Sequence, residues 1–217
     1  EGVEFRVDDT QKQNDVLLHV GELVVGKLKI GAKLEAQVDG RERRAITLNH
    51  SATHLMHAAL RAQLGEHVTQ KGSLVDAARL RFDFSHSAPM TADEIAAIES
   101  AVNAEILKNS AVAKEVMALE AAQQRGAMAL FGEKYGDEVR VVSMGGKFSI
   151  EFCGGTHVER TGDIGLFKIT SESGISSGVR RIEAVTGQGA LALVAREEKT
   201  LRQVCDLVKS NQDDLVE

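Results

Sequence analysis

Residues 45–64, AITLNHSATHLMHAALRAQL, carry the pattern from which the rest of the chain is interpreted. Apolar side chains recur there at steps of three and four residues, which is the period of one face of an α-helix. Thr47 is placed to cap the start of this helix, and Gly65 is the type of residue that commonly follows a helix end. The apolar positions are Leu48, Ala52, Leu55, Ala59 and Leu60.

Two histidines of this helix, His50 and His54, are four residues apart, so their imidazoles share one helix face and could hold one metal ion. A second motif, CGGTH at residues 153–157, directly follows a predicted strand. Its two glycines allow a sharp turn that could bring the Cys153 thiolate and the His157 imidazole to one point. Three nitrogens and one sulfur suit Zn²⁺ better than Mg²⁺ or Ca²⁺. Each motif alone is more often structural, but together they predict a zinc site.

A third histidine, His57, lies on the same predicted helix face. By spacing alone, His54 and His57 could be the ligand pair in place of His50 and His54. The other interpretation makes His57 a histidine beside the ligands or on the surface, and this interpretation is preferred.

The remaining pattern predicts an α+β protein with a mainly antiparallel sheet packed with helices. A small β-barrel portion is expected at residues 1–44, where the positions from Leu28 to Val38 alternate between apolar and polar like a half-buried strand. Residues 45–187 form the central domain, and residues 188–217 a long C-terminal helix. Further strands are expected near residues 72–84, 112–117, 138–143, 147–152, 164–171 and 178–186, and further helices near 91–106, 119–125 and 188–210.

Composition limits the classes of function. The net charge of −6 argues against tight, non-specific binding to nucleic acid, which depends on neutralising phosphates. Two cysteines and no signal peptide favour a reducing cytoplasm. The first residue is glutamate, so we expect a fragment of a longer chain. A role with nucleic acid would need local positive patches, for which the candidates are Arg41, Arg43 and Arg44, then Arg79 and Arg81, then Arg180 and Arg181. For each group alone, solvated surface charge is the more ordinary interpretation.

The segments HSATHLMHAAL and CGGTHV together resemble the editing domain of alanyl-tRNA synthetases. They also resemble the stand-alone editing relatives of that domain and, more distantly, the editing domain of threonyl-tRNA synthetases. The segments TQKGSLVDAARLRFDFSH and SSGVRRIEAVTG belong to the same resemblance, which covers residues 45–187. A preceding β-barrel and a following long helix also match what flanks this domain in the full synthetase.

The resemblance implies roles for individual residues. It assigns the metal ligands as His50, His54, Cys153 and His157, and it leaves His57 outside the ligand pattern. Thr53 matches a position that lines the amino-acid pocket. Gln70 and Ser73 match pocket positions that affect hydrolysis; without the resemblance they would be interpreted as part of a turn. Arg180 matches a position near the tRNA end; without the resemblance it would be interpreted as an exposed arginine on a strand.

The implied reaction is hydrolysis of the ester that joins serine or glycine to the alanine-specific tRNA. A site built for alanine discriminates against one methyl or one hydroxyl by only about 1–3 kcal/mol, so a second, hydrolytic site is needed. Zinc would polarise the ester carbonyl and lower the pKa of a water molecule. Because four protein ligands normally mark a closed structural site, we expect three firm ligands and one exchangeable position.

The sequence offers three alternatives, and it argues strongly against the first. A zinc peptidase needs a carboxylate base beside its histidines, whereas Ser51, Ala52 and Thr53 stand between His50 and His54. A zinc-stabilised RNA-binding module would need metal to fold but would not hydrolyse esters. A stand-alone editing protein is also possible, although the apolar spacing of the last helix fits continuation outward as a coiled coil as well as packing on this domain.

Overall fold

The computed structural model describes residues 2–14, 16–129 and 135–216. It divides into two compact units, Glu1–Val38 and Asp39–Glu217. None of the helices among the described residues is long and apolar enough to cross a membrane. The predicted boundaries at residues 44/45 and 187/188 stay predictions.

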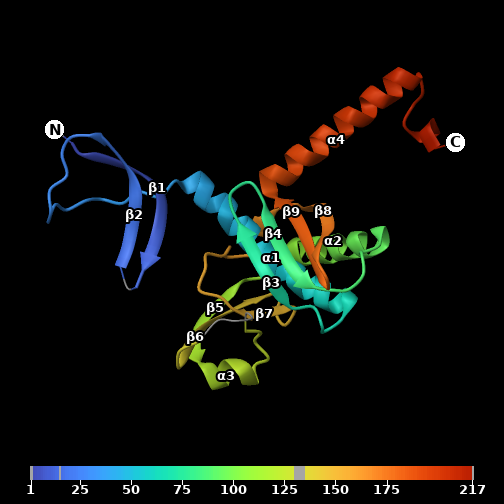
Figure 1. The fold of residues 1–217 in the computed structure, drawn as a ribbon. Helices are drawn as coiled ribbons and strands as arrows, with labels where there is room; N and C mark the ends of the chain where they lie inside the picture. The colour runs from blue at the N-terminus through green and yellow to red at the C-terminus, as the bar shows by residue number, and fades with distance from the viewer. Residues whose placement is uncertain (1, 15, 130–134, 217) are drawn as a thin grey trace. The chain divides into compact units, whose positions relative to one another are not determined.

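The first unit contains one antiparallel hairpin of β1 (Glu4–Gln13) and β2 (Val16–Val25) (Figure 1). The strand predicted from the alternation between Leu28 and Val38 is wrong, because residues 26–39 form no strand. A strand needs a neighbour to bond its backbone groups, and within this unit β1 and β2 pair only with each other. The apolar side chains of residues 28–38 are accordingly exposed.

The second unit is built around α1 (Gly40–Leu64), which begins five residues before the predicted start. The cap is Asp39, whose Oδ1 accepts hydrogen bonds from the backbone N–H groups of Arg41 and Glu42 at 2.8 and 3.1 Å. Thr47 is therefore not the cap, and its hydroxyl instead donates to the carbonyl of Arg43. Gly65 ends the helix as predicted.

Two antiparallel sheets flank α1 and contact it through β3, β4, β7 and β9 (Figure 1). With the helices, these sheets confirm the predicted α+β class. The four-stranded sheet has the order β3-β4-β9-β8, and the three-stranded sheet has the order β5-β6-β7. The strands are β3 (Gln70–Val75), β4 (Leu80–Ser85), β5 (Ala113–Ala118), β6 (Glu138–Met144), β7 (Ser149–Phe152), β8 (Phe167–Ser176) and β9 (Val179–Thr186).

The other helices lie at the edges of this arrangement. Helix α2 (Ala92–Leu107) packs on α1 and β8, and it begins at the predicted capping box of Thr91 and Glu94. Helix α3 (Leu119–Gln124) covers β5 and β6, and α4 (Gly187–Val208) contacts β8 and β9. The 3₁₀ turns are Thr161–Ile164 and Asp213–Val216.

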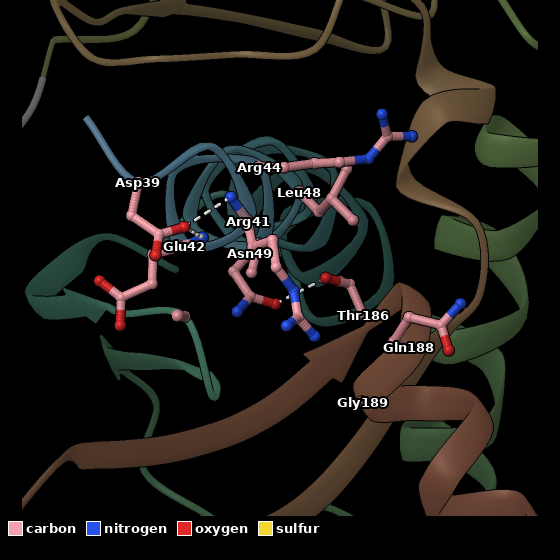
Figure 2. Close-up of a pocket in the computed structure, with 11 residues that line it drawn as sticks. Asp39, Arg41, Glu42, Arg44, Leu48, Asn49, Thr186, Gln188 and Gly189 are labelled. Carbon is pink, nitrogen blue, oxygen red and sulfur yellow. Dashed lines mark hydrogen bonds between the residues drawn. The ribbon is translucent and has the colours of Figure 1, made fainter. Parts of the chain in front are cut away.

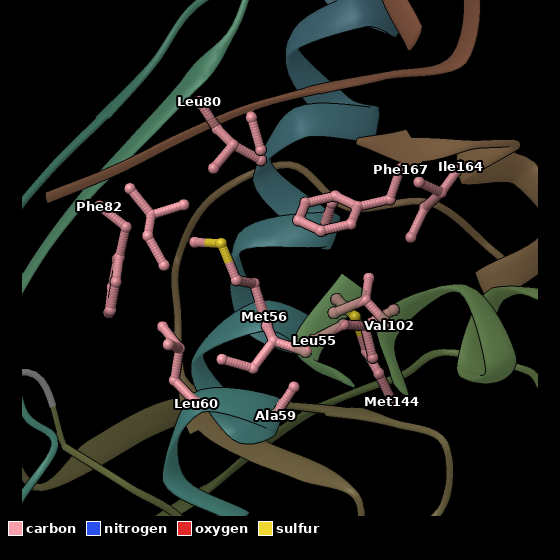
Figure 3. Close-up of a cluster of buried hydrophobic side chains, with 14 of the residues drawn as sticks. Leu55, Met56, Ala59, Leu60, Leu80, Phe82, Val102, Met144, Ile164 and Phe167 are labelled. Carbon is pink, nitrogen blue, oxygen red and sulfur yellow. The ribbon is translucent and has the colours of Figure 1, made fainter. Parts of the chain in front are cut away.

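The main core forms around α1. Figure 3 shows Leu55, Met56 and Leu60 of this helix among side chains from both sheets and from α2. Burial of each side chain of this size stabilises the folded state by about 1.5–3 kcal/mol relative to leaving it exposed. These contacts fix the rotation of α1 about its own axis, so the direction in which its histidines point is fixed as well. The neighbouring core side chains include Leu80, Phe82, Val102, Met144, Ile164 and Phe167.

Candidate metal centre

The structure brings both predicted motifs together at the middle of α1. Cys153, directly after β7, places its Sγ 3.4 Å from His50 Nε2 and 3.2 Å from His157 Nε2. The ring centroids of His50, His54 and His157 are 4.4–5.2 Å apart. One ligand atom from each of these four residues lies within 4.8 Å of all the others, so the group could hold one metal ion.

Glycine at residue 155 permits this close approach. A Cβ atom on Gly155 would lie 2.2 Å from Cε1 and 2.7 Å from Nδ1 of the His50 ring, whereas a Cβ on Gly154 would meet nothing within 4 Å. The turn is also held from both sides. Arg140 donates to the carbonyl oxygens of Cys153 and Gly155, and the hydroxyls of Thr47 and Thr156 are 3.0 Å apart.

Sequence reasoning missed Glu151, the carboxylate behind the histidines. Its Oε2 lies 2.6 Å from His54 Nδ1, and its Oε1 lies 3.0 Å from His57 Nδ1. Only 2% of Glu151 is exposed. The sequence held a signal for it, because residues two apart on a strand point to the same face, so Glu151 and Cys153 should lie side by side. His57 is buried but is not one of the four candidate ligands. It contacts Glu151, which in turn contacts the candidate ligand His54.

The electrostatics favour ligand-competent forms of the thiol and of His157. Burial raises the pKa of Cys153, but hydrogen bonds from His157 and His50 outweigh it and lower that pKa to about 3. Burial is also the main reason that the pKa of His157 is lowered to about 4. At neutral pH these groups are therefore a thiolate and a neutral imidazole, which are the forms that bind metals.

His54 and Glu151 form a buried, coupled pair. Burial lowers the pKa of His54, but the Glu151 carboxylate and Cys153 outweigh it and raise the pKa to about 10. Burial conversely raises the pKa of Glu151, yet His54 and His57 bring it down to about 2. The metal-free centre therefore carries a proton on His54 that a bound metal ion would displace.

The residues present fit a zinc ion. His54 Nε2 is buried and has no hydrogen-bond partner among the described residues, while its Nδ1 is engaged by Glu151. This nitrogen is therefore left for the ion. Three imidazole nitrogens and one thiolate form a set typical of zinc sites.

A cavity of about 430 Å³ lies beside the group, and His50 and Cys153 are part of its wall. The predicted catalytic residues Thr53, Gln70 and Ser73 do not line it. The further lining residues are Tyr135, Glu138, Val139, Arg140, Phe152, Gly154 and Gly155.

The three predicted catalytic residues lie on α1 and on β3. Thr53 is buried within the helix, and its hydroxyl donates to the carbonyl of Asn49 at 2.9 Å. Gln70 and Ser73 belong to β3, where they pair with Phe84 and Phe82 across a bulge. Gln70 is half-buried there, and Ser73 is exposed. Their roles in hydrolysis stay predictions.

A second cavity, of about 480 Å³, lies along the first turns of α1 and next to the start of α4 (Figure 2). Arg41 and Arg44 line it, and a 2.7 Å hydrogen bond from Thr186 to the side chain of Asn49 lies at its base. Within the described part of the chain, neither arginine nor their neighbour Arg43 has an ion-pair partner. None of the four candidate metal ligands lines this cavity.

The predicted tRNA-binding residue Arg180 is already engaged. Its guanidinium makes two hydrogen bonds to the Glu172 carboxylate, at 2.6 and 2.8 Å, and the pair is largely buried. Its neighbour Arg181 is held in the same two-bonded way by Asp83. A role for Arg180 in binding tRNA stays a prediction. It would require Arg180 to leave Glu172, or to bind a tRNA phosphate while it keeps that contact.

Comparison with known proteins identifies the region. Residues 139–183 match the family described as the threonyl and alanyl tRNA synthetase second additional domain. Over all 217 residues the chain is 60% identical to an alanine–tRNA ligase of Saccharophagus degradans. Over 213 residues it is 59% identical to one of Pseudomonas fluorescens and 57% identical to one of Pseudomonas syringae pv. syringae.

The matches cover 98–100% of this chain but only 24–25% of each relative, so the chain spans about a quarter of the length of the proteins it matches. The domain match includes Cys153, His157 and Arg180, whereas His50 and His54 precede it. The chain therefore corresponds over its whole length to a segment of alanine–tRNA ligases, and residues 139–183 of it match the second additional domain of threonyl and alanyl tRNA synthetases.

Proposed function

We propose that this segment hydrolyses the ester bond of wrongly charged alanine-specific tRNA and releases serine or glycine. The observation that carries the proposal is the meeting of His50, His54, Cys153 and His157 within 4.8 Å, in a segment shared with alanine–tRNA ligases. The need for such a reaction follows from the small difference between the competing amino acids, about 1–3 kcal/mol for one methyl or hydroxyl group. A cytoplasmic location stays a prediction.

Zinc is the metal that this ligand set favours, with His50, His54, Cys153 and His157 as its ligands. When bound, it supplies Lewis-acid polarisation of the ester carbonyl and lowers the pKa of water. The cavity walled by His50 and Cys153 provides space beside the ion.

Protein side chains would then position the substrate. We assign selectivity for the amino acid to Thr53, and support of hydrolysis to Gln70 and Ser73. Arg180 would contact the tRNA end. Arg41 and Arg44, which form no ion pair within the described part of the chain, would offer phosphate contacts that compensate for the acidic net charge of the segment. The remainder of the synthetase would supply further affinity for tRNA.

The deciding experiment measures deacylation of Ser-tRNA by the isolated chain, with and without a chelator. We expect turnover that the chelator abolishes and that zinc restores. Full turnover by protein shown to be free of metal would remove the metal from the mechanism. Metal-dependent stability without any turnover would instead support the rival function, a zinc-stabilised RNA-binding module. The observation that favours this rival is the number of ligands, because four protein ligands normally mark a structural zinc site.

Thr53→Val provides a test of selectivity, since valine keeps the methyl group and the shape of threonine but removes its hydroxyl. We expect the ratio of serine to glycine hydrolysis to change roughly 10-fold, while zinc content stays at the level of the unmodified chain. The measurement is the deacylation rate on both charged tRNAs, with metal analysis of the same samples.

The matched control is Thr200→Val. Thr200 also donates its hydroxyl to a carbonyl one turn earlier, but it lies on the exposed part of α4. Equal loss of both activities in Thr53→Val together with lost zinc would show that Thr53 supports the metal centre and does not select the amino acid.

A further inference from the structure

We propose that Glu151 is a positioning residue that aims His54 at the metal, and that His57 holds Glu151 in place. The structure shows one buried carboxylate between two imidazoles, with Oε2 2.6 Å from His54 Nδ1 and Oε1 3.0 Å from His57 Nδ1. This inference rests on the metal centre of the proposed function. It adds a role for two residues that do not contact the ion.

Hydrogen-bond chemistry sets the direction of both bonds. An ionised carboxylate only accepts hydrogen bonds, so each Nδ1 must carry the hydrogen that it donates. In neutral His54 the lone pair then lies on Nε2, a buried nitrogen that has no hydrogen-bond partner among the described residues, as is also true of Nε2 of His57. Glu151 thus selects the tautomer and the ring orientation that a metal ligand needs.

His57 completes the arrangement by occupying the second oxygen. All three residues are at least 95% buried, so an oxygen without a partner would be costly. Without the His57 bond, the carboxylate would be free to turn about its own axis, and it would no longer fix the His54 ring. The other side of His57 faces Phe82, with ring centroids 5.0 Å apart, which leaves His57 no role as a ligand in this group.

Substitution by glutamine separates positioning from space filling. Glutamine has nearly the same shape, but its amide offers one accepting oxygen and one donating NH₂ group. It can accept from only one of the two Nδ1–H groups, so the other histidine must change its tautomer. We expect Glu151→Gln to lower zinc affinity roughly 10- to 100-fold, the range measured when such supporting partners are removed.

Three further substitutions separate charge and packing from geometry. Glu151→Asp keeps the charge but withdraws the carboxylate by one methylene, so we expect it to lose as much affinity as Glu151→Gln. His57→Asn keeps an N–H donor near the position of Nδ1, and we expect its affinity to stay near that of the unmodified chain. His57→Leu removes the donor and should weaken zinc binding.

The experiment uses the 217-residue chain and measures zinc affinity by competition with a chromophoric chelator. In parallel, ¹⁵N NMR of the zinc-loaded chain reports which ring nitrogen of His54 and His57 carries hydrogen. The matched control is Glu105→Gln, because Glu105 is also a buried glutamate, 4% exposed, but lies on α2 away from the four ligands. It should lower the free energy of unfolding and leave zinc affinity unchanged.

Each outcome has one meaning. Weakened zinc binding in Glu151→Gln, Glu151→Asp and His57→Leu, with hydrogen on Nδ1 of both histidines in the unmodified chain, supports the inference. Unchanged affinity in Glu151→Gln, an equal loss in Glu105→Gln, or hydrogen on Nε2 of His54 would overturn it while the metal centre stands. Failure of the unmodified chain to bind zinc would overturn the metal centre, and the inference with it.

Discussion

Replacing Cys153 with alanine is expected to abolish both zinc binding and ester hydrolysis. The thiolate is the single sulfur of the group, and it lies 3.2–3.4 Å from two of the three imidazoles. Its removal takes away the negative charge of the four-residue group itself and leaves three neutral or protonated rings. A supporting partner alone contributes 10- to 100-fold to affinity, so loss of this direct ligand should lower affinity by at least about 100-fold.

The matched control for this substitution is Cys205→Ala. Cys205 is the other free cysteine of the chain, and it lies on α4. We expect it to keep zinc content and turnover at the level of the unmodified chain. Metal content measured by mass spectrometry and the rate of Ser-tRNA deacylation decide the result. Retained turnover in a metal-free Cys153→Ala chain would contradict the proposed use of the metal.

Exchange of Gly155 for alanine should have the second largest effect. The added Cβ would lie 2.2 Å from a ring atom of His50, a distance that real Cβ atoms essentially never show. The turn cannot simply retreat, because Arg140 holds the carbonyls of Cys153 and Gly155. The His50 ring must therefore move away from Cys153, and we expect zinc affinity to fall at least about 10-fold.

Gly154→Ala makes a strict comparison for this effect. A Cβ at Gly154 meets nothing within 4 Å, and neither glycine is among those with positive φ. The two variants therefore differ in contact with His50 and not in backbone strain. Chelator competition on both chains provides the measurement. Similar affinities for Gly155→Ala and Gly154→Ala would show that the His50 ring adapts without loss.

Local patterns predicted those parts of the structure that local forces determine. The four-residue spacing of His50 and His54 and the CGGTH turn identified the group that the fold brings together. The capping box of Thr91 and Glu94 fixed the start of α2. By contrast, the start of α1 was hidden by the charged run after Asp39, which interrupts the apolar period although it continues the helix.

The role of Glu151 required knowledge of packing. In β7, alternation assigns the apolar residues Ile150 and Phe152 to the core face and Glu151 to the outward face. They instead pack in a smaller cluster with Ala122 of α3, so the polar face of the strand is the one that meets α1. Alternation reports which residues share a face, but it does not report which face is covered by which element.

The strand predicted between Leu28 and Val38 failed for a related reason. Its alternation is real, yet a strand forms only where a neighbouring strand offers its free backbone groups. Among the described residues of this unit, β1 and β2 pair with each other, and neither pairs with residues 28–38.

Because His50 and Cys153 are 103 residues apart, an ion held between them closes a loop that contains nearly half of the chain. For a covalent bridge that closes a loop of this length, the chain-entropy description gives a stabilisation of about 4–5 kcal/mol, because the unfolded chain loses conformational entropy. A zinc ion in this position would therefore act as a reversible cross-link between the helix and the turn. Its supply would set how often this unit opens and becomes accessible to proteases, separately from any part it takes in catalysis.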